Sequence, residues 1–214
     1  MCIRDSGWFD DKWKPIFNGE KGVGAINVLK QVTANAQRNF TSAANDECTI
    51  ALQQGVAVMG PQWATRAASM DDEKKSTVVG KIDWVAPPGG GQRIAADGYA
   101  ISAFSKQDPD TLFKIIATSS NDTNMRGAAA FILPPRKSVL NDPELKAKNR
   151  HYPASLVSLE VGQPFPRLPE FYEVGEFITR RVNQALTGEM EVKAALDAAA
   201  KETEELLASR GYYK

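Results

Sequence analysis

The sequence predicts a mixed α/β protein in which helices dominate the C-terminal half. Several segments carry apolar residues at steps of three or four, the period of a helix with one buried face, and capping residues bound them. Three short apolar runs closed by glycine or proline are typical of strands, and they lie at residues 56–59, 82–86 and 99–104. Short strands distributed among many helices indicate an α/β architecture.

Two long helices are expected near the C-terminus. The first has an apolar stripe and ends at Gly188. Its stripe consists of Phe171, Val174, Ile178, Val182 and Ala185. The second ends at Gly211 and turns Glu202, Glu204 and Glu205 toward solvent. Its stripe consists of Val192, Ala195, Leu196, Ala199 and Leu206.

Capping signals predict further helices. Asp108 and Asp142 each precede a proline, the arrangement of an N-cap followed by proline at the first helical position. Apolar residues at 25, 26, 29 and 32 indicate another helix near the start of the chain. Ile50 and Leu52 belong to a helix that ends at Gly55.

Composition excludes several classes of protein. The 214 residues include 26 Lys+Arg and 26 Asp+Glu, so the chain lacks the basic excess of nucleic-acid-binding proteins. No stretch is long and apolar enough for a membrane span, and the first ten residues contain no signal-peptide core. Taken literally, such a chain stays in the cytoplasm. Residues 1–6 fit no helix, strand or cap pattern, and we expect them to be a non-native prefix.

Residues for common catalytic and metal sites are scarce. Cys2 and Cys48 form neither a disulfide framework nor a metal motif, and Cys48 is expected as a small buried residue on a helix. His151 is the one histidine, has no ligand spacing around it, and is expected on the surface or partly packed. The glycines at 89–91 lack the lysine of a phosphate loop. We therefore expect no metal, no cofactor and no enzymatic activity.

Three segments in succession resemble the family 1 extracellular solute-binding proteins, the carbohydrate receptors of ABC importers. Each motif alone has low specificity, but their order and spacing match over nearly the whole chain after Ser6. The motifs are the helix, strand and tryptophan of residues 51–63, the pair Trp84–Gly90 and Asp97–Lys106, and the proline-rich turn of residues 133–143.

The resemblance implies a periplasmic binding protein-like (type II) α/β fold, represented mainly by its C-terminal lobe, with helices and short strands of a mixed sheet. Residues 7–96 and 136–214 would form that lobe, and residues 97–135 would be an excursion into the N-terminal lobe. The rest of that lobe would be absent, so the chain would be a truncated fragment. Proteins of the family reside in the periplasm or are tethered outside the membrane.

Five residues are expected to bind ligand. Trp63 follows Gly60-Pro61 at a strand-to-helix turn, where the family often places a stacking tryptophan, and an aromatic face suits the C–H face of a sugar. Asp97 and Gly98 offer a carboxylate and an accessible backbone beside Tyr99. Arg136 carries a planar fork that suits neighbouring hydroxyls. Alternatively, each of these residues packs, turns or forms a salt bridge, whereas Trp8 and Trp13 are expected to pack.

The resemblance implies a monomeric receptor that closes over a sugar or polyol and then docks on the membrane subunits of an importer. Three alternatives stay open from the sequence. A carbohydrate-active enzyme would need a pair of catalytic carboxylates. A sensory module would use the same scaffold for signalling, and a truncated fragment would bind nothing.

Overall fold

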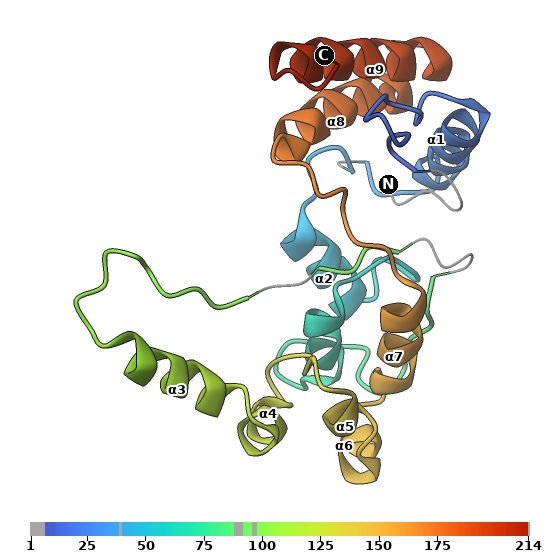
Figure 1. Ribbon diagram of the computed structural model, residues 1–214. Coiled ribbons are helices and arrows are strands. Elements are labelled where there is room, and N and C mark those ends of the chain that lie inside the picture. The colour runs from blue at the N-terminus through green and yellow to red at the C-terminus, as the bar shows by residue number, and fades with distance from the viewer. Residues whose placement is uncertain (1–6, 39, 88–91, 96–97, 214) are drawn as a thin grey trace. The chain divides into compact units, whose positions relative to one another are not determined.

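The computed structural model describes residues 7–38, 40–87, 92–95 and 98–213 (Figure 1). Its described residues are mainly helical. In chain order the helices are α1 (Glu20–Thr33), α2 (Asn45–Gln53), the 3₁₀ helix η1 (Ala64–Asp71), α3 (Pro109–Ser119), α4 (Asp122–Ala128), α5 (Lys137–Leu140), α6 (Pro143–Lys148), α7 (Tyr152–Val161), α8 (Phe171–Thr187) and α9 (Val192–Ser209).

The predicted helix signals are confirmed. Asp108 accepts a hydrogen bond from the backbone N–H of Thr111, and Asp142 accepts from Glu144 and Leu145, so both aspartates cap helices that begin with proline. Gly188 ends α8 in the left-handed conformation, with φ of 83°. Cys48 lies on α2 as expected, but it is only partly buried.

The three predicted strands are wrong for the described residues. Pairing there is limited to two isolated bridges, Phe9–Pro15 and Arg93–Gln163. A strand requires a neighbour that accepts and donates its backbone hydrogen bonds, and the three apolar runs have no such ladder. Their side chains are accordingly exposed: Val58 is 98% exposed and Phe104 is 90% exposed. The three apolar runs therefore predicted strands that have no pairing partner among the described residues.

The described chain forms two compact units. The terminal unit consists of described residues up to 43, residues 92–93 and residues 163–213. The central unit consists of described residues 44–87, 94–95 and 98–162. These bounds follow packing within the chain, whereas the expected lobe and excursion follow a resemblance, and that lobe assignment stays a prediction.

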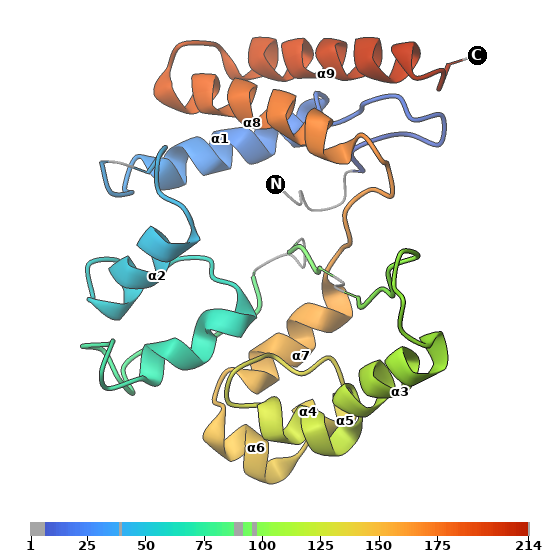
Figure 2. The ribbon, with the colours of Figure 1, turned by 90° about the vertical axis from the view of Figure 1, so that its left-hand side faces the viewer.

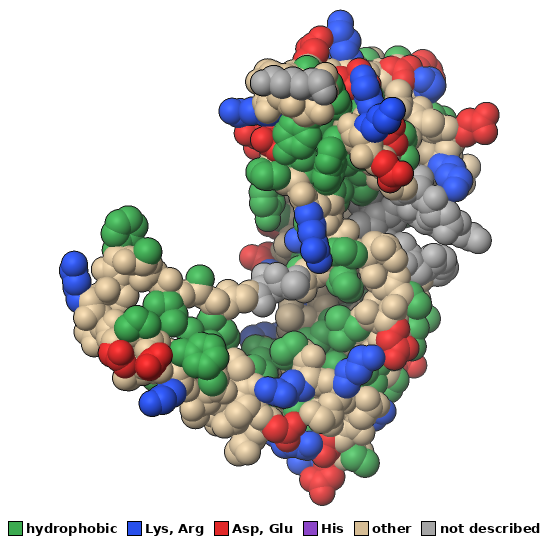
Figure 3. Space-filling model, viewed as in Figure 1, with side chains coloured by type: hydrophobic (Ala, Val, Ile, Leu, Met, Phe, Trp, Pro, Cys, Tyr) green, Lys and Arg blue, Asp and Glu red, His purple; other side chains and the backbone are tan. Residues whose placement is uncertain are grey.

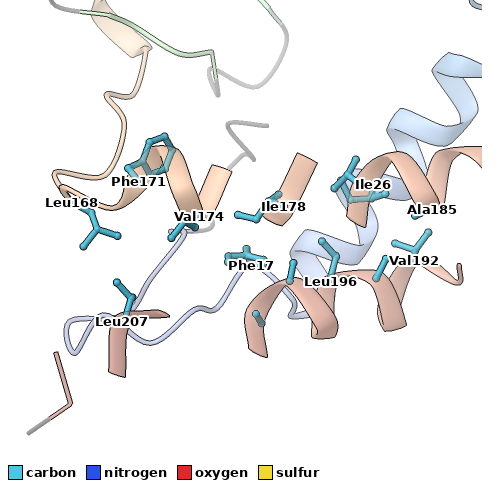
Figure 4. Packing of buried hydrophobic residues seen from close by; sticks show 14 residues of the cluster. Phe17, Ile26, Leu168, Phe171, Val174, Ile178, Ala185, Val192, Leu196 and Leu207 are labelled. Atoms are coloured by element: carbon cyan, nitrogen blue, oxygen red, sulfur yellow. The ribbon is translucent and has the colours of Figure 1, made fainter. Parts of the chain in front are cut away.

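In the terminal unit, α1, α8 and α9 lie side by side (Figure 2). A continuous hydrophobic core fills the space between them. Every residue of the predicted α8 stripe is buried. In the close-up, Ile26, Ile178 and Leu196 come from three different helices and gather with Phe17 (Figure 4). Gly22 allows α1 to approach Phe17, since a Cβ at Gly22 would lie 1.6 Å from the Phe17 carbonyl oxygen. On α9, Leu207 is fully buried and the predicted Leu206 is partly buried.

The central unit has a smaller core. Ala129, Leu140 and Tyr152 are buried together, with Leu133, Leu145 and Leu156 packed around them. No residue of α3 is buried. Apolar side chains gather on the surface over α3 and the loop before it (Figure 3). No helix in the described part of the chain is both long enough and apolar enough to span a membrane.

Candidate ligand-binding site

Trp63 lies at the start of η1 with part of its indole accessible to solvent. Trp63 is the N-cap residue of η1 and has extended backbone angles. The chain passes at this residue from the segment after Gly60 into η1. The indole Nε1 donates to Asn45 Oδ1 at 3.1 Å, and the backbone N–H donates to Gln62 Oε1 at 2.9 Å. The side chain is 37% exposed. Its ring is therefore oriented by hydrogen bonds while one portion stays open.

The two residues that bond to Trp63, Asn45 and Gln62, belong to a network of polar side chains from α2, residue 62 and η1. The Thr49 hydroxyl accepts from Gln62 Nε2 at 2.7 Å and from an Arg66 guanidinium nitrogen at 3.2 Å, and donates to the Asn45 carbonyl at 2.6 Å. Arg66 also pairs with Asp46, whose side chain is largely exposed. We call Asn45, Asp46, Thr49, Gln62, Trp63 and Arg66 the Trp63 platform.

The chemistry of the platform suits recognition of hydroxyl groups. An indole face packs against C–H groups, an exposed carboxylate accepts hydrogen bonds, and a guanidinium donates them. The Thr49 hydroxyl already donates to a backbone carbonyl, so its proton has a structural use. Hydrogen bonds thus join these polar groups to the residues that hold the Trp63 indole.

The sequence predicted Trp63 but not its polar partners. Asn45, Asp46 and Thr49 share the N-terminal part of α2, where the spacings of three and four residues place the first two side chains close to Thr49. That spacing is common on solvated helices and is not diagnostic. The contacts of the platform form only when residues 62–66 pack against α2.

Three of the other predicted site residues, Gly98, Tyr99 and Arg136, lie elsewhere in the central unit. Arg136 is the N-cap residue of α5, and its Nε donates to the carbonyl of Ser120, at the end of α3, at 2.9 Å. Tyr99 is 70% exposed. Gly98 has no atom within 4 Å of the place where a Cβ would lie. Asp97 lies outside the described residues.

A second polar cluster joins the end of η1 to the start of α7. Arg150 NH2 donates to both carboxylate oxygens of Asp71 at 3.1 Å, and its guanidinium lies 4.9 Å above the Trp84 ring. His151 contacts Trp84 and Tyr152 with ring centroids 5.8 and 5.0 Å apart. His151 was expected on the surface or partly packed, but it is only 5% exposed because these rings cover it.

Burial sets the charge state of this cluster. It lowers the pKa of His151, and the negative charge of Asp71 opposes that change only in part. Burial also raises the pKa of Asp71, but hydrogen bonds from the Gly80 N–H and from Arg150, together with the Arg150 charge, bring that pKa below its ordinary value. The cluster therefore favours a neutral histidine beside an ionised aspartate.

A shallow depression in the terminal unit has a volume of ≈ 400 Å³ and is lined by Trp8, Phe9, Asp10, Asp11, Trp13 and Pro166. Its rings pack on neighbours: Trp8 lies 5.1 Å from Phe171, and Phe9 lies 5.7 Å from Trp13, between centroids. The Asp10 carboxylate accepts from the N–H groups of residues 12 and 14. These contacts confirm that Trp8 and Trp13 pack.

In the described part of the chain, His, Cys, Asp and Glu side chains form no group of three or more that could hold a metal ion. The glycines at 89–91 lie outside that part.

Comparison with known proteins identifies the fold. No family model matches the sequence. Among solved structures, maltose-bound MalE3 of T. maritima superimposes with a TM-score of 0.80 at 24% identity, covering 94% of this chain and 54% of that chain. An ABC-transporter solute-binding protein of Agrobacterium radiobacter K84 in complex with ribitol gives 0.77 at 26% identity, covering 95% and 54%. A solute-binding protein of Agrobacterium vitis S4 with D-mannitol gives 0.78 at 22% identity, covering 98% and 56%.

The chain thus spans about half the length of the solved structures that it matches. The neighbours agree with the prediction of a binding protein rather than an enzyme. They also confirm the predicted periplasmic binding protein-like fold, even though the described residues form helices and isolated bridges instead of the expected strands. The chain has the fold of the solute-binding proteins of ABC transporters, over about half of such a protein.

Proposed function

We propose that this chain belongs to the substrate-binding component of an ABC importer for a sugar or polyol, and that Trp63 is the stacking surface for the solute. One observation carries the proposal. A tryptophan that is 37% exposed has its indole held by the Asn45 amide, and the same polar network contains the Asp46–Arg66 ion pair, in a chain with the solute-binding fold.

The chemistry of the solute follows from the platform. Sugars and polyols combine C–H surfaces with a high density of hydroxyl groups that both donate and accept. The Trp63 ring provides the apolar contact, Asp46 an acceptor and Arg66 a donor. The neighbours hold maltose, ribitol and D-mannitol, all uncharged polyhydroxyl compounds. A neutral solute also suits a chain with equal numbers of acidic and basic residues.

The remaining parts of the proposal follow from the sequence. Asp97 and Gly98 would contact hydroxyls beside Tyr99, and Arg136 would supply a second guanidinium. Residues 7–96 and 136–214 would form one lobe, with residues 97–135 as the excursion. The solute would lie between two lobes, and their closure outside the cytoplasmic membrane would allow docking on the importer's membrane subunits.

Calorimetry and thermal shift with maltose, ribitol and D-mannitol test the proposal. We expect at least one of them to raise the melting temperature, because a ligand at 100 times its Kd stabilises a protein by about 2.7 kcal/mol. Trp63→Ala should weaken binding by roughly tenfold or more, as for a buried aromatic anchor, and Trp63→Phe should weaken it less.

Tyr172→Ala is the matched control, since Tyr172 is an exposed aromatic of the terminal unit. It should leave the Kd unchanged. Binding by Trp63→Ala at wild-type affinity would exclude the stacking role, and failure of all three solutes to bind would overturn the proposed function.

A further inference from the structure

The position of Trp63 depends on an unusual helix. η1 (Ala64–Asp71) is a 3₁₀ helix of eight residues that begins directly after Trp63. Runs of 3₁₀ helix longer than three or four residues are uncommon, because their hydrogen bonds have poorer geometry than those of an α-helix. At about 2.0 Å per residue, the eight residues of η1 span roughly 16 Å from Trp63 to the far end of the helix. Such a segment needs contacts with its surroundings to hold it in place.

Those contacts lie along η1 and at its far end. Ala67 and Met70 of η1 are buried within the central unit. Gln53 Nε2 donates to the carbonyl and hydroxyl oxygens of Ser69 at 2.9 and 3.2 Å, which joins η1 to α2. Asp71, the last residue of η1, accepts from the backbone N–H of Gly80 at 3.0 Å.

Arg150 completes the attachment of that end. Besides its two bonds of 3.1 Å to the Asp71 carboxylate, its Nε lies 3.3 Å from Asp71 Oδ2. The same guanidinium donates to the Ile82 carbonyl at 3.0 Å and covers the Trp84 ring. One side chain thus holds the end of η1 and the irregular segment around residues 82–84 against the start of α7. Lysine cannot reproduce this, because it is a point charge without a planar fork.

We propose that Arg150 is a positioning residue for the Trp63 platform. It fixes Asp71, Asp71 fixes the end of η1, and η1 sets the direction in which Trp63 presents its ring. The inference rests on the proposed function for its effect on affinity, but its effect on Trp63 can be measured without a ligand.

The experiment combines ligand affinity with a direct observation of Trp63. The full chain is labelled with 5-fluorotryptophan, and Trp63→Phe assigns the ¹⁹F resonance of Trp63 among the four tryptophans. We expect Arg150→Gln to shift or broaden the Trp63 resonance. It should also raise the Kd for D-mannitol, ribitol or maltose, whichever the wild type binds best, by about threefold to thirtyfold. Arg150→Lys should give intermediate values.

Arg210→Gln is the matched control. Arg210 is an exposed arginine of the terminal unit that pairs with Glu173 at 3.6 Å, and its loss should move neither readout. Circular dichroism identifies the temperature at which each variant is folded. If Arg150→Gln does not fold, Arg150→Lys decides the question alone.

The inference is overturned if the Trp63 resonance stays in place in a folded Arg150 variant, or if affinity changes by less than about twofold. If the wild type binds none of the three solutes, the proposed function fails. The resonance of Trp63 then decides the positioning role by itself, so the two failures are distinguishable.

Discussion

The terminal unit and the central unit differ in the interactions that stabilise each of them. The terminal unit buries fourteen residues in one core, and its helices α8 and α9 carry apolar stripes at the helical period. The central unit buries three residues in its cluster and connects many short or irregular segments through polar side chains such as Arg150 and Gln53. Helical periodicity fixes the buried faces of the first unit, whereas hydrogen bonds from side chains join the short segments of the second.

This difference bears on function. A well-packed helical core tolerates little change but offers few open polar groups, whereas a unit built from side-chain hydrogen bonds exposes such groups at its surface. Trp63 and its polar partners lie in the central unit. The candidate site therefore occurs where the fold depends on specific polar contacts.

The largest expected effect comes from truncating the terminal core. Leu196 of α9 is 1% exposed in the terminal core, so Leu196→Ala should lower the free energy of unfolding by roughly 2–5 kcal/mol. Val32→Ala, at an exposed position of α1, should change it by less than about 0.5 kcal/mol. Urea denaturation measures both values.

Hydrogen exchange read by peptide then separates the units. Leu196→Ala should speed exchange in α1, α8 and α9 and leave α4–α7 as in the wild type. Equal acceleration in both units would show that the chain unfolds as one body, and the contrast between the units would then lose its energetic meaning.

A smaller effect is expected from one hydroxyl in the central unit. Tyr152 is fully buried, and its hydroxyl donates to the Ala129 carbonyl at 3.2 Å. Tyr152→Phe should cost about 1 kcal/mol, because the buried carbonyl loses this donor. Tyr172→Phe, at an exposed tyrosine of α8, is the control and should be neutral. A neutral Tyr152→Phe would mean that polar contacts contribute less to the central unit than we infer.

The sequence predicted the helices because their signals are local. Asp108 and Asp142 sit next to the prolines and amides that they cap, and the α8 stripe repeats within seventeen residues. The prediction of strands at residues 56–59, 82–86 and 99–104 was wrong, because a strand needs a partner that no local pattern specifies.

The candidate site follows the same rule. Trp63 was predicted from its place after Gly60-Pro61, a local signal, and its role in binding stays a prediction. Thr49, Gln62 and Arg66 were missed because they meet only when η1 folds onto α2. His151 was expected on the surface or partly packed, and that expectation failed because Trp84, a neighbour distant in sequence, helps to bury it.

The pH dependence of stability offers a milder test of the central unit. Burial lowers the pKa of His151 below its ordinary value of 6.5. The unfolded chain therefore takes up a proton at higher pH than the folded chain, so stability present above pH 6.5 is lost as the pH falls through the folded pKa.

His151 is the one histidine of the chain, so its NMR titration is unambiguous. His151→Phe keeps an aromatic ring between Trp84 and Tyr152 and should remove the loss of stability in this pH range. A folded His151 that titrates at or above pH 6.5 would contradict the burial by which we explain the cluster.

The smallest effect should come from the apolar run at residues 56–59. Val58 is 98% exposed, so Val58→Asp removes no packing and should change stability by less than about 0.5 kcal/mol. Leu52→Asp is the contrast: Leu52 is 8% exposed on α2, and a charge there should unfold the central unit. Urea denaturation distinguishes the two variants. A loss above about 1 kcal/mol for Val58→Asp would mean that this side chain is buried in solution, and that its run is paired as the sequence predicted.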